Sequence, residues 1–431
     1  MNGRECSGAE HTARRARQTL IAAVVLCAIQ SLSAGTALDP RLPRGSDRDV
    51  PFGAYYDKLS YSPEWDAPWS VGPDADVVVR FGRDKPRLIF WRGANFIPCW
   101  VNDRGAWYSD GAVVRGPAGP QNDRLCRYSF ASVVESSDAR VVVRWRYALV
   151  DPDGKLINLD PVTRWNDWVD ELYTLYPDAT GVRRITLHSS NWEQPISCQQ
   201  SILLSEPGQR VPRTGVRLSG TAPNAKNIQV VNCTGSRPFQ VVAPEGAQFQ
   251  SGLPVAANWS DWPAAGATEK PGHHFLGGIS WKPFAEDRTS KSWLMLVGQT
   301  RQRPAQLEPV ARAWLAAPAL KLNSEGFSSA GYDVREKSYQ LACDQPGAPR
   351  AIRFSLEANA NAPVINPAFV IKGWGRSAAA LTLNGRHLKQ GSDFCAGFRK
   401  TSTVSDLILW VRRNSPRPVA LEIKPIASEQ K

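Results

Sequence analysis

The chain has 431 residues and carries 52 Lys and Arg against 40 Asp and Glu, a formal net charge of +12. Such an excess favours an anionic partner: nucleic acid, a membrane surface or an acidic polymer. The basic residues are scattered without a Lys/Arg block, which argues against a polybasic tail or a lipid-binding patch. The length suffices for two domains with sizeable cores.

The N-terminal region has the pattern of a secretory signal peptide. Arg14, Arg15 and Arg17 precede a short apolar run, LIAAVVLCAI, and small residues follow up to Ala37. The run is too short to anchor the chain across a bilayer. We expect residues 1–37 to be removed and the mature protein to be secreted or periplasmic, with no membrane contact. Export disfavours nucleic acid and leaves an acidic polysaccharide as the expected partner, although a basic surface without a specific partner explains the charge equally well.

Six cysteines follow the signal region: Cys99, Cys126, Cys198, Cys233, Cys343 and Cys395. An even number in an oxidising compartment predicts up to three disulfides. We expect sequential pairing, because Cys343 and Cys395 lie together in the last third of the chain. No Cys-x-x-Cys pair or other metal motif is present in the sequence, so we expect neither a metal nor another cofactor.

The remaining pattern predicts an all-β protein of two packed β-sandwich domains with few helices. Residues 38–75, rich in Pro, Asp and aromatics, predict an extended lead-in. Residues 76–304 show short apolar runs between turn-forming clusters, and predict a first sandwich that acts on the glycan. Residues 305–320 have apolar positions at helical spacing and predict a helical linker. Residues 321–431 predict a second sandwich, with a hairpin turn in LTLNGRHL.

The stretch DARVVVRWRYALVD (residues 138–151) predicts a strand with two unlike faces. One face is apolar and predicts the core side: Val141, Val143, Trp145, Tyr147 and Leu149. The other face carries Arg140, Arg144 and Arg146, whose guanidinium groups are well shaped to hold a carboxylate or sulfate. These arginines either bind the acidic polymer or pair with Asp and Glu on neighbouring strands.

The chain also contains 16 tryptophans, several of them in polar, turn-like surroundings. Aromatic faces on a β scaffold commonly stack against the apolar faces of sugar rings. We hypothesise that some of them form a substrate groove, with four candidates: Trp107, Trp165, Trp168 and Trp192. Each one taken singly is also explained as a core or lid residue.

Four segments, in order over most of the mature chain, suggest a family. They are RLIFWRGANFIPCWV (87–101), CRYSFASVVESSDARVVVRWRYAL (126–149), DELYTLYPDATGVRRITLHSSN (170–191) and NPAFVIKGWG (366–375). The chain resembles secreted β-rich proteins of polysaccharide-degrading marine bacteria, in particular the ulvan lyases of polysaccharide lyase family 40. The resemblance implies β-elimination on a polymer that carries uronic carboxylates and sulfates. In that family the hairpin is followed by a Trp-His-Glu-Phe stretch, whereas this chain has NWEQPISCQQ and lacks the histidine.

Three classes of function follow. A polysaccharide lyase, the function we expect, must neutralise the uronate carboxylate and supply a base and a proton donor. A non-catalytic binder of acidic glycans is favoured by the missing histidine. A glycoside hydrolase needs two carboxylates facing each other across a groove, and no pattern in the sequence selects such a pair.

The hairpin WVDELYTLYPDATGVRRITLHSS (168–190) predicts a catalytic cluster. With a turn at 177–180, Tyr176 lies opposite Gly181, and residues opposite each other share a face. One face then collects four polar groups: Glu171, Tyr173, Arg184 and His188. The tyrosine would be the proton donor, the histidine the base and the arginine the carboxylate clamp, oriented by the glutamate. The alternative is a solvated polar face with a Glu–Arg contact, and a one-residue register slip would scatter the cluster.

Overall fold

The computed structural model describes residues 52–58, 76–82, 85–101, 107–110, 113–123, 125–192, 197–198, 202–205, 217–219, 228–232, 237–242, 248–250, 274–275, 278–280, 282–302 and 306–426. Within these ranges the chain is strand-rich and contains a single α-helix, α3 (Glu308–Leu315), which confirms the all-β class. No helix in the described ranges is long and apolar enough to cross a membrane. The predicted signal peptide lies outside the described residues, and the predicted lead-in contributes only strand β1 (Phe52–Asp57) and residue 58 to them.

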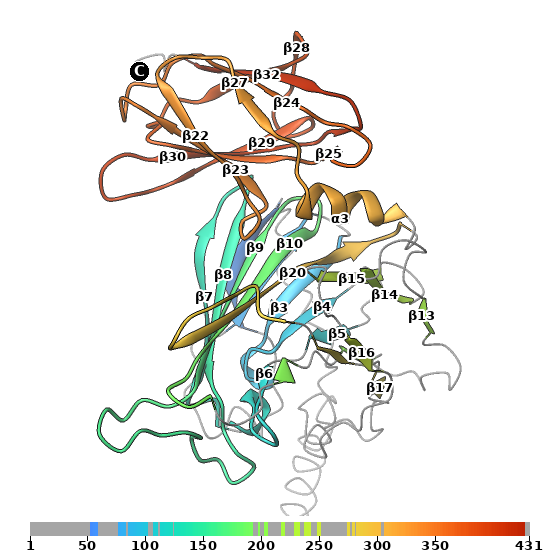
Figure 1. The fold of residues 1–431 in the computed structure, drawn as a ribbon, viewed down its shortest axis with the longest axis vertical. Helices are drawn as coiled ribbons and strands as arrows, with labels where there is room; N and C mark the ends of the chain where they lie inside the picture. The colour runs from blue at the N-terminus through green and yellow to red at the C-terminus, as the bar shows by residue number, and fades with distance from the viewer. Residues whose placement is uncertain are drawn as a thin grey trace, which may run out of the picture.

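The first sandwich consists of two large, mainly antiparallel sheets (Figure 1). The seven-stranded sheet has the order β1-β2-β3-β4-β5-β12-β17, with β2 (Asp76–Phe81), β3 (Arg87–Phe90), β4 (Pro98–Val101), β5 (Trp107–Asp110), β12 (Ile202–Ser205) and β17 (His274–Phe275). The nine-stranded sheet has the order β13-β14-β15-β20-β10-β9-β8-β7, with β19 paired to β20. Its strands are β7 (Ser129–Ser136), β8 (Val141–Ala148), β9 (Trp168–Leu175), β10 (Thr180–His188), β13 (Arg217–Ser219), β14 (Ile228–Asn232), β15 (Arg237–Val242), β19 (Ala285–Glu286) and β20 (Ser290–Thr300).

Short elements complete this part of the chain. Two-stranded sheets join β6 (Val113–Val114) to β11 (Ser197–Cys198), and β16 (Gln248–Gln250) to β18 (Gly278–Ser280). Two 3-10 helices, η1 (Arg92–Ala94) and η2 (Pro120–Asn122), lie in the connections.

The core of the first sandwich lies between its two large sheets. The predicted apolar face of β8 is confirmed, because Val141, Val143, Trp145, Tyr147 and Leu149 are all fully buried. They pack with side chains of the seven-stranded sheet such as Phe81, Phe90 and Trp100. Alternation along β8 therefore turns its even-numbered residues to the outer face of the nine-stranded sheet.

The second sandwich packs two five-stranded sheets around its own core. One has the order β21-β24-β32-β27-β28, with β21 (Leu320–Leu322), β24 (Ile352–Leu356), β32 (Val419–Pro425), β27 (Ala379–Leu383) and β28 (Arg386–His387). The other has the order β22-β23-β26-β30-β29, with β22 (Phe327–Asp333), β23 (Ser338–Cys343), β26 (Ala368–Lys372), β30 (Asp406–Val411) and β29 (Phe394–Arg399). A small sheet pairs β25 (Val364–Ile365) with β31 (Asn414–Ser415). The Asn-Gly turn predicted between β27 and β28 is confirmed, with Asn384 and Gly385 both at positive φ.

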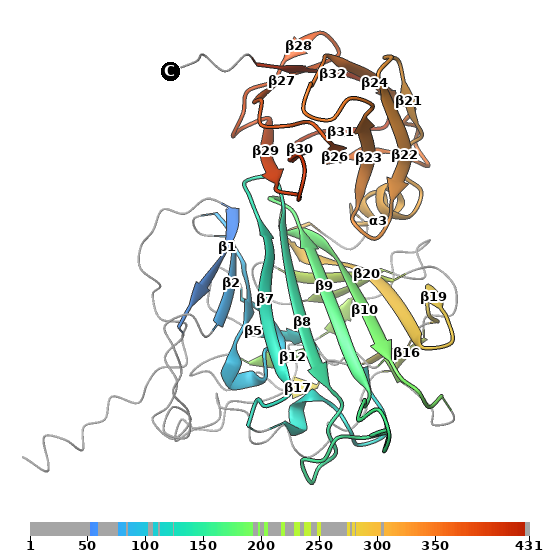
Figure 2. The same cartoon turned by 90° about the vertical axis from the view of Figure 1, so that its left-hand side faces the viewer.

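The second sandwich sits on one end of the first, against the turns of the β7–β8 and β9–β10 hairpins (Figures 1 and 2). Ala139 and Tyr176 from these turns pack with Val370, Ile408 and Trp410 of the second sandwich. Helix α3 forms a further contact, because its Ala311 and Trp314 cover apolar residues on the outer face of the nine-stranded sheet. The predicted helix between the two β-rich parts is thus confirmed.

The predicted sequential disulfides are wrong for the cysteines whose side chains the structure describes. Cys99, Cys126, Cys343 and Cys395 form no disulfide. Cys343 faces the core of the second sandwich, whereas Cys395 packs against the apolar contact between the sandwiches. They belong to opposite faces of one sheet, so their sulfur atoms cannot meet. Cys233 and the side chain of Cys198 lie outside the described residues.

Candidate functional site

The predicted pairing of the β9–β10 hairpin is wrong by one residue. Tyr173 lies opposite Arg183 rather than Arg184, and His188 lies opposite Trp168 rather than Val169. Since successive side chains in a strand point to opposite faces, this shift divides the predicted catalytic cluster. Glu171 and Tyr173 point into the sandwich core, whereas Arg184 and His188 lie on the outer face.

The turn explains the shift. Tyr176 N–H donates to the Thr180 carbonyl at 2.8 Å, so the loop contains three residues, 177–179, and not four. Ala179 takes the left-handed position, φ 59°, that completes a three-residue hairpin loop. Gly181 allows β10 to lie close to β9, because a Cβ at this position would lie 2.4 Å from the Thr174 carbonyl oxygen.

The inward half of the predicted cluster forms a buried polar network. The Arg183 guanidinium holds the Glu171 carboxylate with Nε at 2.7 Å from Oε2 and Nη2 at 3.0 Å from Oε1, and both side chains are fully buried. Tyr147 and Tyr173 donate their hydroxyls to the same carboxylate at 2.9 and 2.7 Å. Burial, reinforced by the Glu171 charge, raises the pKa of Tyr147 well above its ordinary value and keeps its hydroxyl protonated. The charges are paired and hydrogen-bonded, as buried charges must be.

This network is buried in the core of the first sandwich. Tyr173 and Glu171 have no exposed surface and pack among core residues, with the Phe90 ring edge-on to Tyr173 at 5.1 Å. A polysaccharide on the protein surface cannot touch either group in this arrangement. The tyrosine and glutamate are therefore structural in the described geometry.

The outward half of the cluster gathers on the open face of the nine-stranded sheet, toward the viewer in Figure 2. Cross-strand pairing places Arg146 beside Asp170, and Trp168 beside His188. A neighbouring row places Leu172 between Arg144 and Arg184. We call Arg144, Arg146, Trp168, Asp170, Arg184 and His188 the outer-face cluster.

Asp170 is the centre of the outer-face cluster. Arg144 reaches Asp170 Oδ1 with Nε at 2.8 Å, and Arg146 reaches Oδ1 and Oδ2 with Nε at 2.9 Å and Nη2 at 2.6 Å. His188 Nε2 lies 3.5 Å from Oδ2. Burial alone would raise the pKa of Asp170, but hydrogen bonds from His188, Arg146 and Arg144 lower it well below its ordinary value. The carboxylate therefore stays charged and holds both guanidinium groups in place.

The outer-face cluster is accessible. The side chains of Arg144, Arg146 and His188 are 35%, 31% and 47% exposed, whereas that of Asp170 is 12% exposed. Two arginines against one carboxylate leave a positive charge on an open sheet face, and Arg184 adds a half-buried guanidinium. Arg144 and Arg146 therefore pair with an Asp on the neighbouring strand, as one explanation predicted, and they also remain exposed to solvent, as binding of a polymer requires.

Arg140 does not belong to this face, and the prediction that it does is wrong. It is 1% exposed and pairs with Glu135 at 2.7 Å and with Glu336 of the second sandwich at 2.8 Å. The reason is its place just before β8, where the second sandwich covers the end of the sheet. Arg140 therefore joins the two sandwiches rather than facing a polymer.

The structure describes the side chains of three of the four candidate tryptophans, and these do not share one surface, because Trp168 lies on the outer face whereas Trp192 packs against the core of the first sandwich. Trp168 is half-buried, with the Arg146 guanidinium carbon 5.9 Å from its ring centre. Trp165 is 66% exposed on the loop that leads into β9. Trp192 donates Nε1–H to the Arg288 carbonyl and carries Lys291 over its ring at 4.9 Å. The Trp107 side chain lies outside the described residues.

Three residues of these two networks were not selected from the sequence: Asp170, Arg183 and Tyr147. Tyr147 was assigned to the core as an apolar residue, although a buried tyrosine hydroxyl normally needs a partner. That need was a signal for a nearby carboxylate. Asp170 and Arg183 were missed because each is one position away from the residue that the predicted register selected.

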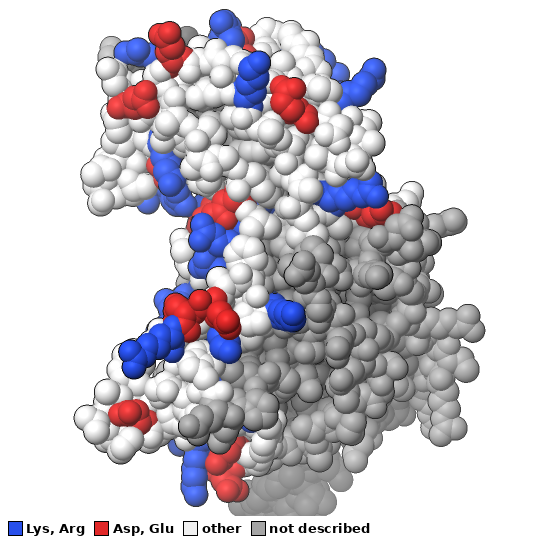
Figure 3. Space-filling view, in the orientation of Figure 1, with Lys and Arg blue, Asp and Glu red and all other residues white. Residues whose placement is uncertain are grey.

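On the face of the molecule seen in Figure 3, the charge of the described residues is mixed rather than of one sign. Lys and Arg lie beside Asp and Glu over both sandwiches in Figure 3, without a broad basic field. No described group of three or more His, Cys, Asp and Glu residues could hold a metal ion. The outer-face cluster is a local group of described residues in which hydrogen bonds to Asp170 hold two guanidinium groups in place.

No protein-family model matches the sequence, and no curated protein matches it. The function of this chain has to be inferred from its own residues.

Proposed function

We propose that the protein binds an acidic polysaccharide, one that carries uronic carboxylates or sulfates, on the outer face of the nine-stranded sheet. The observation that carries this proposal is the pair Arg144 and Arg146, held by Asp170 on an open sheet face. Each guanidinium uses Nε and Nη2 toward Asp170, which leaves the Nη1 donors for a second carboxylate or sulfate.

Binding at this face is favoured by preorganisation. An arginine that must be ordered on binding loses side-chain entropy, which weakens affinity. Here Asp170 already holds both guanidinium groups, so that loss is smaller. The planar guanidinium also matches the two-oxygen geometry of a carboxylate or sulfate.

Aromatic side chains at the margins of the face support a sugar ligand. Trp168 lies beside Arg146, and Phe130, opposite Arg146 on β7, is 44% exposed. Trp165, on the loop that leads into β9, is exposed to solvent. A sugar ring has apolar C–H faces that stack on such rings while its charged groups reach the arginines.

Export of the chain belongs to the same proposal. The basic start, short apolar run and small residues up to Ala37 support a signal peptide and a secreted or periplasmic location. We propose a uronate- and sulfate-bearing polymer as the partner from the resemblance that the four sequence segments suggest to ulvan lyases of polysaccharide lyase family 40, a resemblance that no family model matches. A polymer of that kind is met outside the cell.

The test is binding of the mature protein to uronate polymers and sulfated polymers, with a neutral glucan as the reference. We expect retention of the acidic polymers in affinity electrophoresis, and loss of about tenfold or more in affinity for the Arg144→Ala/Arg146→Ala variant. Arg353→Ala is the matched control, because Arg353 pairs with Glu422 on the surface of the second sandwich. Equal loss in the control, or unchanged binding in the double variant, would refute the outer-face site.

β-Elimination at the same face is the second candidate, and the His188–Asp170 pair favours it. His188 is exposed beside two arginines, so it could remove the proton next to a uronate carboxylate that Arg144 or Arg146 neutralises. Asp170 would orient the imidazole. The described residues of the outer-face cluster include no tyrosine, so the leaving oxygen would take its proton from water or from a group outside them.

Product analysis separates the function classes. Unsaturated uronate ends, detected by their ultraviolet absorbance, indicate a lyase, and His188→Ala should then abolish them while His387→Ala, an exposed control on β28, does not. New reducing ends without unsaturation indicate hydrolysis, which needs two carboxylates across a groove. Binding without either product indicates a non-catalytic glycan-binding protein.

A further inference from the structure

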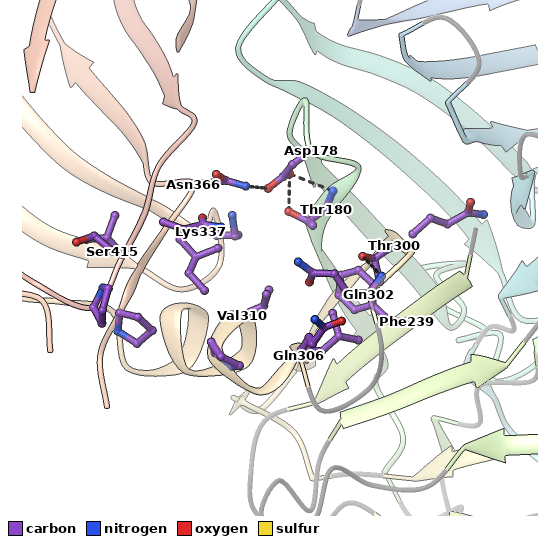
Figure 4. A pocket seen from close by; sticks show the side chains of 18 residues that line it. Asp178, Thr180, Phe239, Thr300, Gln302, Gln306, Val310, Lys337, Asn366 and Ser415 are labelled. Atoms are coloured by element: carbon purple, nitrogen blue, oxygen red, sulfur yellow. Dashed lines mark hydrogen bonds between the residues drawn. The ribbon is translucent and has the colours of Figure 1, made fainter. Parts of the chain in front are cut away.

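A cavity of about 440 Å³ lies between the two sandwiches (Figure 4). Asp178, Thr180, Phe239, Thr300 and Gln302 line it from the first sandwich. Helix α3 contributes Pro309 and Val310, and the second sandwich contributes Lys337, Pro363, Asn366 and Ser415. The volume falls within the range of about 300–1,000 Å³ that small-molecule sites occupy.

Lys337 is the unusual group in this cavity. It lies in the turn between β22 and β23 with a φ of 52°, and only 4% of its surface is exposed. Its ammonium lies 5.1 Å from the centre of the Tyr176 ring, and within the described part of the chain it makes no hydrogen bond and no ion pair. Burial lowers the pKa of Lys337, an effect that nearby Asp178 partly offsets.

The neighbouring carboxylate does not satisfy this ammonium. Asp178 accepts hydrogen bonds from Thr180 Oγ1 at 2.7 Å and from Asn366 Nδ2 at 2.8 Å, which Figure 4 shows as dashed lines. Asp178 Oδ2 thus connects the two sandwiches, whereas Oδ1 accepts hydrogen bonds within the turn of the first sandwich. A buried cation without an acceptor is costly, so an anionic ligand in the cavity would supply what Lys337 lacks.

We propose that the interdomain cavity binds a small sugar acid, a uronic acid or sulfated sugar of one or two rings, with its anionic group on Lys337. The prolines and Val310 offer apolar surface to the ring, and the surrounding amide and hydroxyl groups face its hydroxyls. The need for an anion rests on the cavity alone, whereas the choice of a sugar rests on the proposed function. Such a ligand contacts both sandwiches and α3, and therefore holds them together.

Calorimetric titration of the full chain with sodium glucuronate, glucose and sodium sulfate tests the site. We expect glucuronate to bind, and glucose to bind at least about tenfold more weakly because it lacks the anion. Lys337→Met, which keeps the apolar stem and removes the charge, should weaken glucuronate binding about tenfold or more. Lys372→Met, at an exposed position on β26, is the control and should leave it unchanged.

Three outcomes overturn the proposal: no glucuronate binding at millimolar concentration, equal affinity in Lys337→Met, or binding of sulfate but not glucuronate. Should Lys337→Met fail to fold, Val310→Trp replaces it, because an indole there fills the cavity and must abolish glucuronate binding. Retained affinity in that variant also overturns the proposal. Arg144→Ala/Arg146→Ala should lose polymer binding yet keep glucuronate binding, so failure at one site is distinguishable from failure at the other.

Discussion

Arg183 and Arg184 are adjacent arginines on β10 with opposite environments, and exchanging each for methionine tests the observed register directly. Arg183 is fully buried against Glu171, whereas Arg184 is half-buried on the outer face. Arg183→Met leaves the Glu171 carboxylate charged and unpaired in the core, a change that costs about 3–5 kcal/mol of unfolding free energy. Arg184→Met removes no described hydrogen bond or ion pair and should cost about 1 kcal/mol or less.

The compensating variant Arg183→Met/Glu171→Gln sharpens the test. Glutamine keeps an acceptor for the hydroxyls of Tyr147 and Tyr173 but removes the unpaired charge. We therefore expect the double variant to cost less than the sum of the two single variants, with a coupling of about 1 kcal/mol or more.

Urea unfolding followed by tryptophan fluorescence and circular dichroism measures these free energies. The unfolding midpoint of Arg183→Met should fall well below that of Arg184→Met, because a loss of this size is a large part of a total of about 5–15 kcal/mol. Equal midpoints, a larger loss for Arg184→Met, or strictly additive single variants would refute the buried Glu171–Arg183 pair. A larger loss for Arg184→Met is the result that the sequence-predicted register requires.

Three further predictions concern the outer face and the turn. Binding of an acidic polymer should weaken steadily from low to high salt, because added ions shorten the screening length to about 8 Å at physiological ionic strength. Salt-independent affinity in electrophoresis would contradict an ionic contact. Asp170→Asn should cost about 1.5–3 kcal/mol at pH 7. The pKa of Asp170 is lowered in the folded protein. The stability that this carboxylate contributes is therefore complete above the ordinary pKa of 3.8, and it declines progressively as the pH falls from there toward the lowered pKa. The difference between wild type and variant in urea unfolding should shrink from pH 7 to pH 3, and a constant difference would show that this charge is not stabilised. Gly181→Ala should destabilise by about 1–3 kcal/mol through the clash with the Thr174 carbonyl, whereas Ala179→Gly, at φ 59°, should be neutral or stabilising in thermal unfolding; the reverse order would contradict the three-residue loop.

Features that depend on residues close together in the chain could be predicted from the sequence alone. The period-two alternation in residues 138–151 identified a strand and its core face, since burying an apolar side of a sheet requires that period. Helical spacing before residue 316 identified α3, and an Asn-Gly pair identified the β27–β28 turn. Each of these features depends on neighbours within a few residues, so the local sequence contains the information.

The composition of the two polar networks was decided by tertiary structure. Pro177, Asp178 and Gly181 are compatible with a three- or a four-residue loop, and one residue of difference exchanges Arg184 for Arg183 as the partner of Tyr173. The choice depends on β10 also pairing with β20 and on a core in which Glu171 finds the hydroxyl of Tyr147. Arg140 likewise became an interdomain residue only because Glu336, almost two hundred residues away, reaches it. Residue type and period determine which faces exist, but the partners on each face come from distant segments, and the free energy of those contacts selects the register.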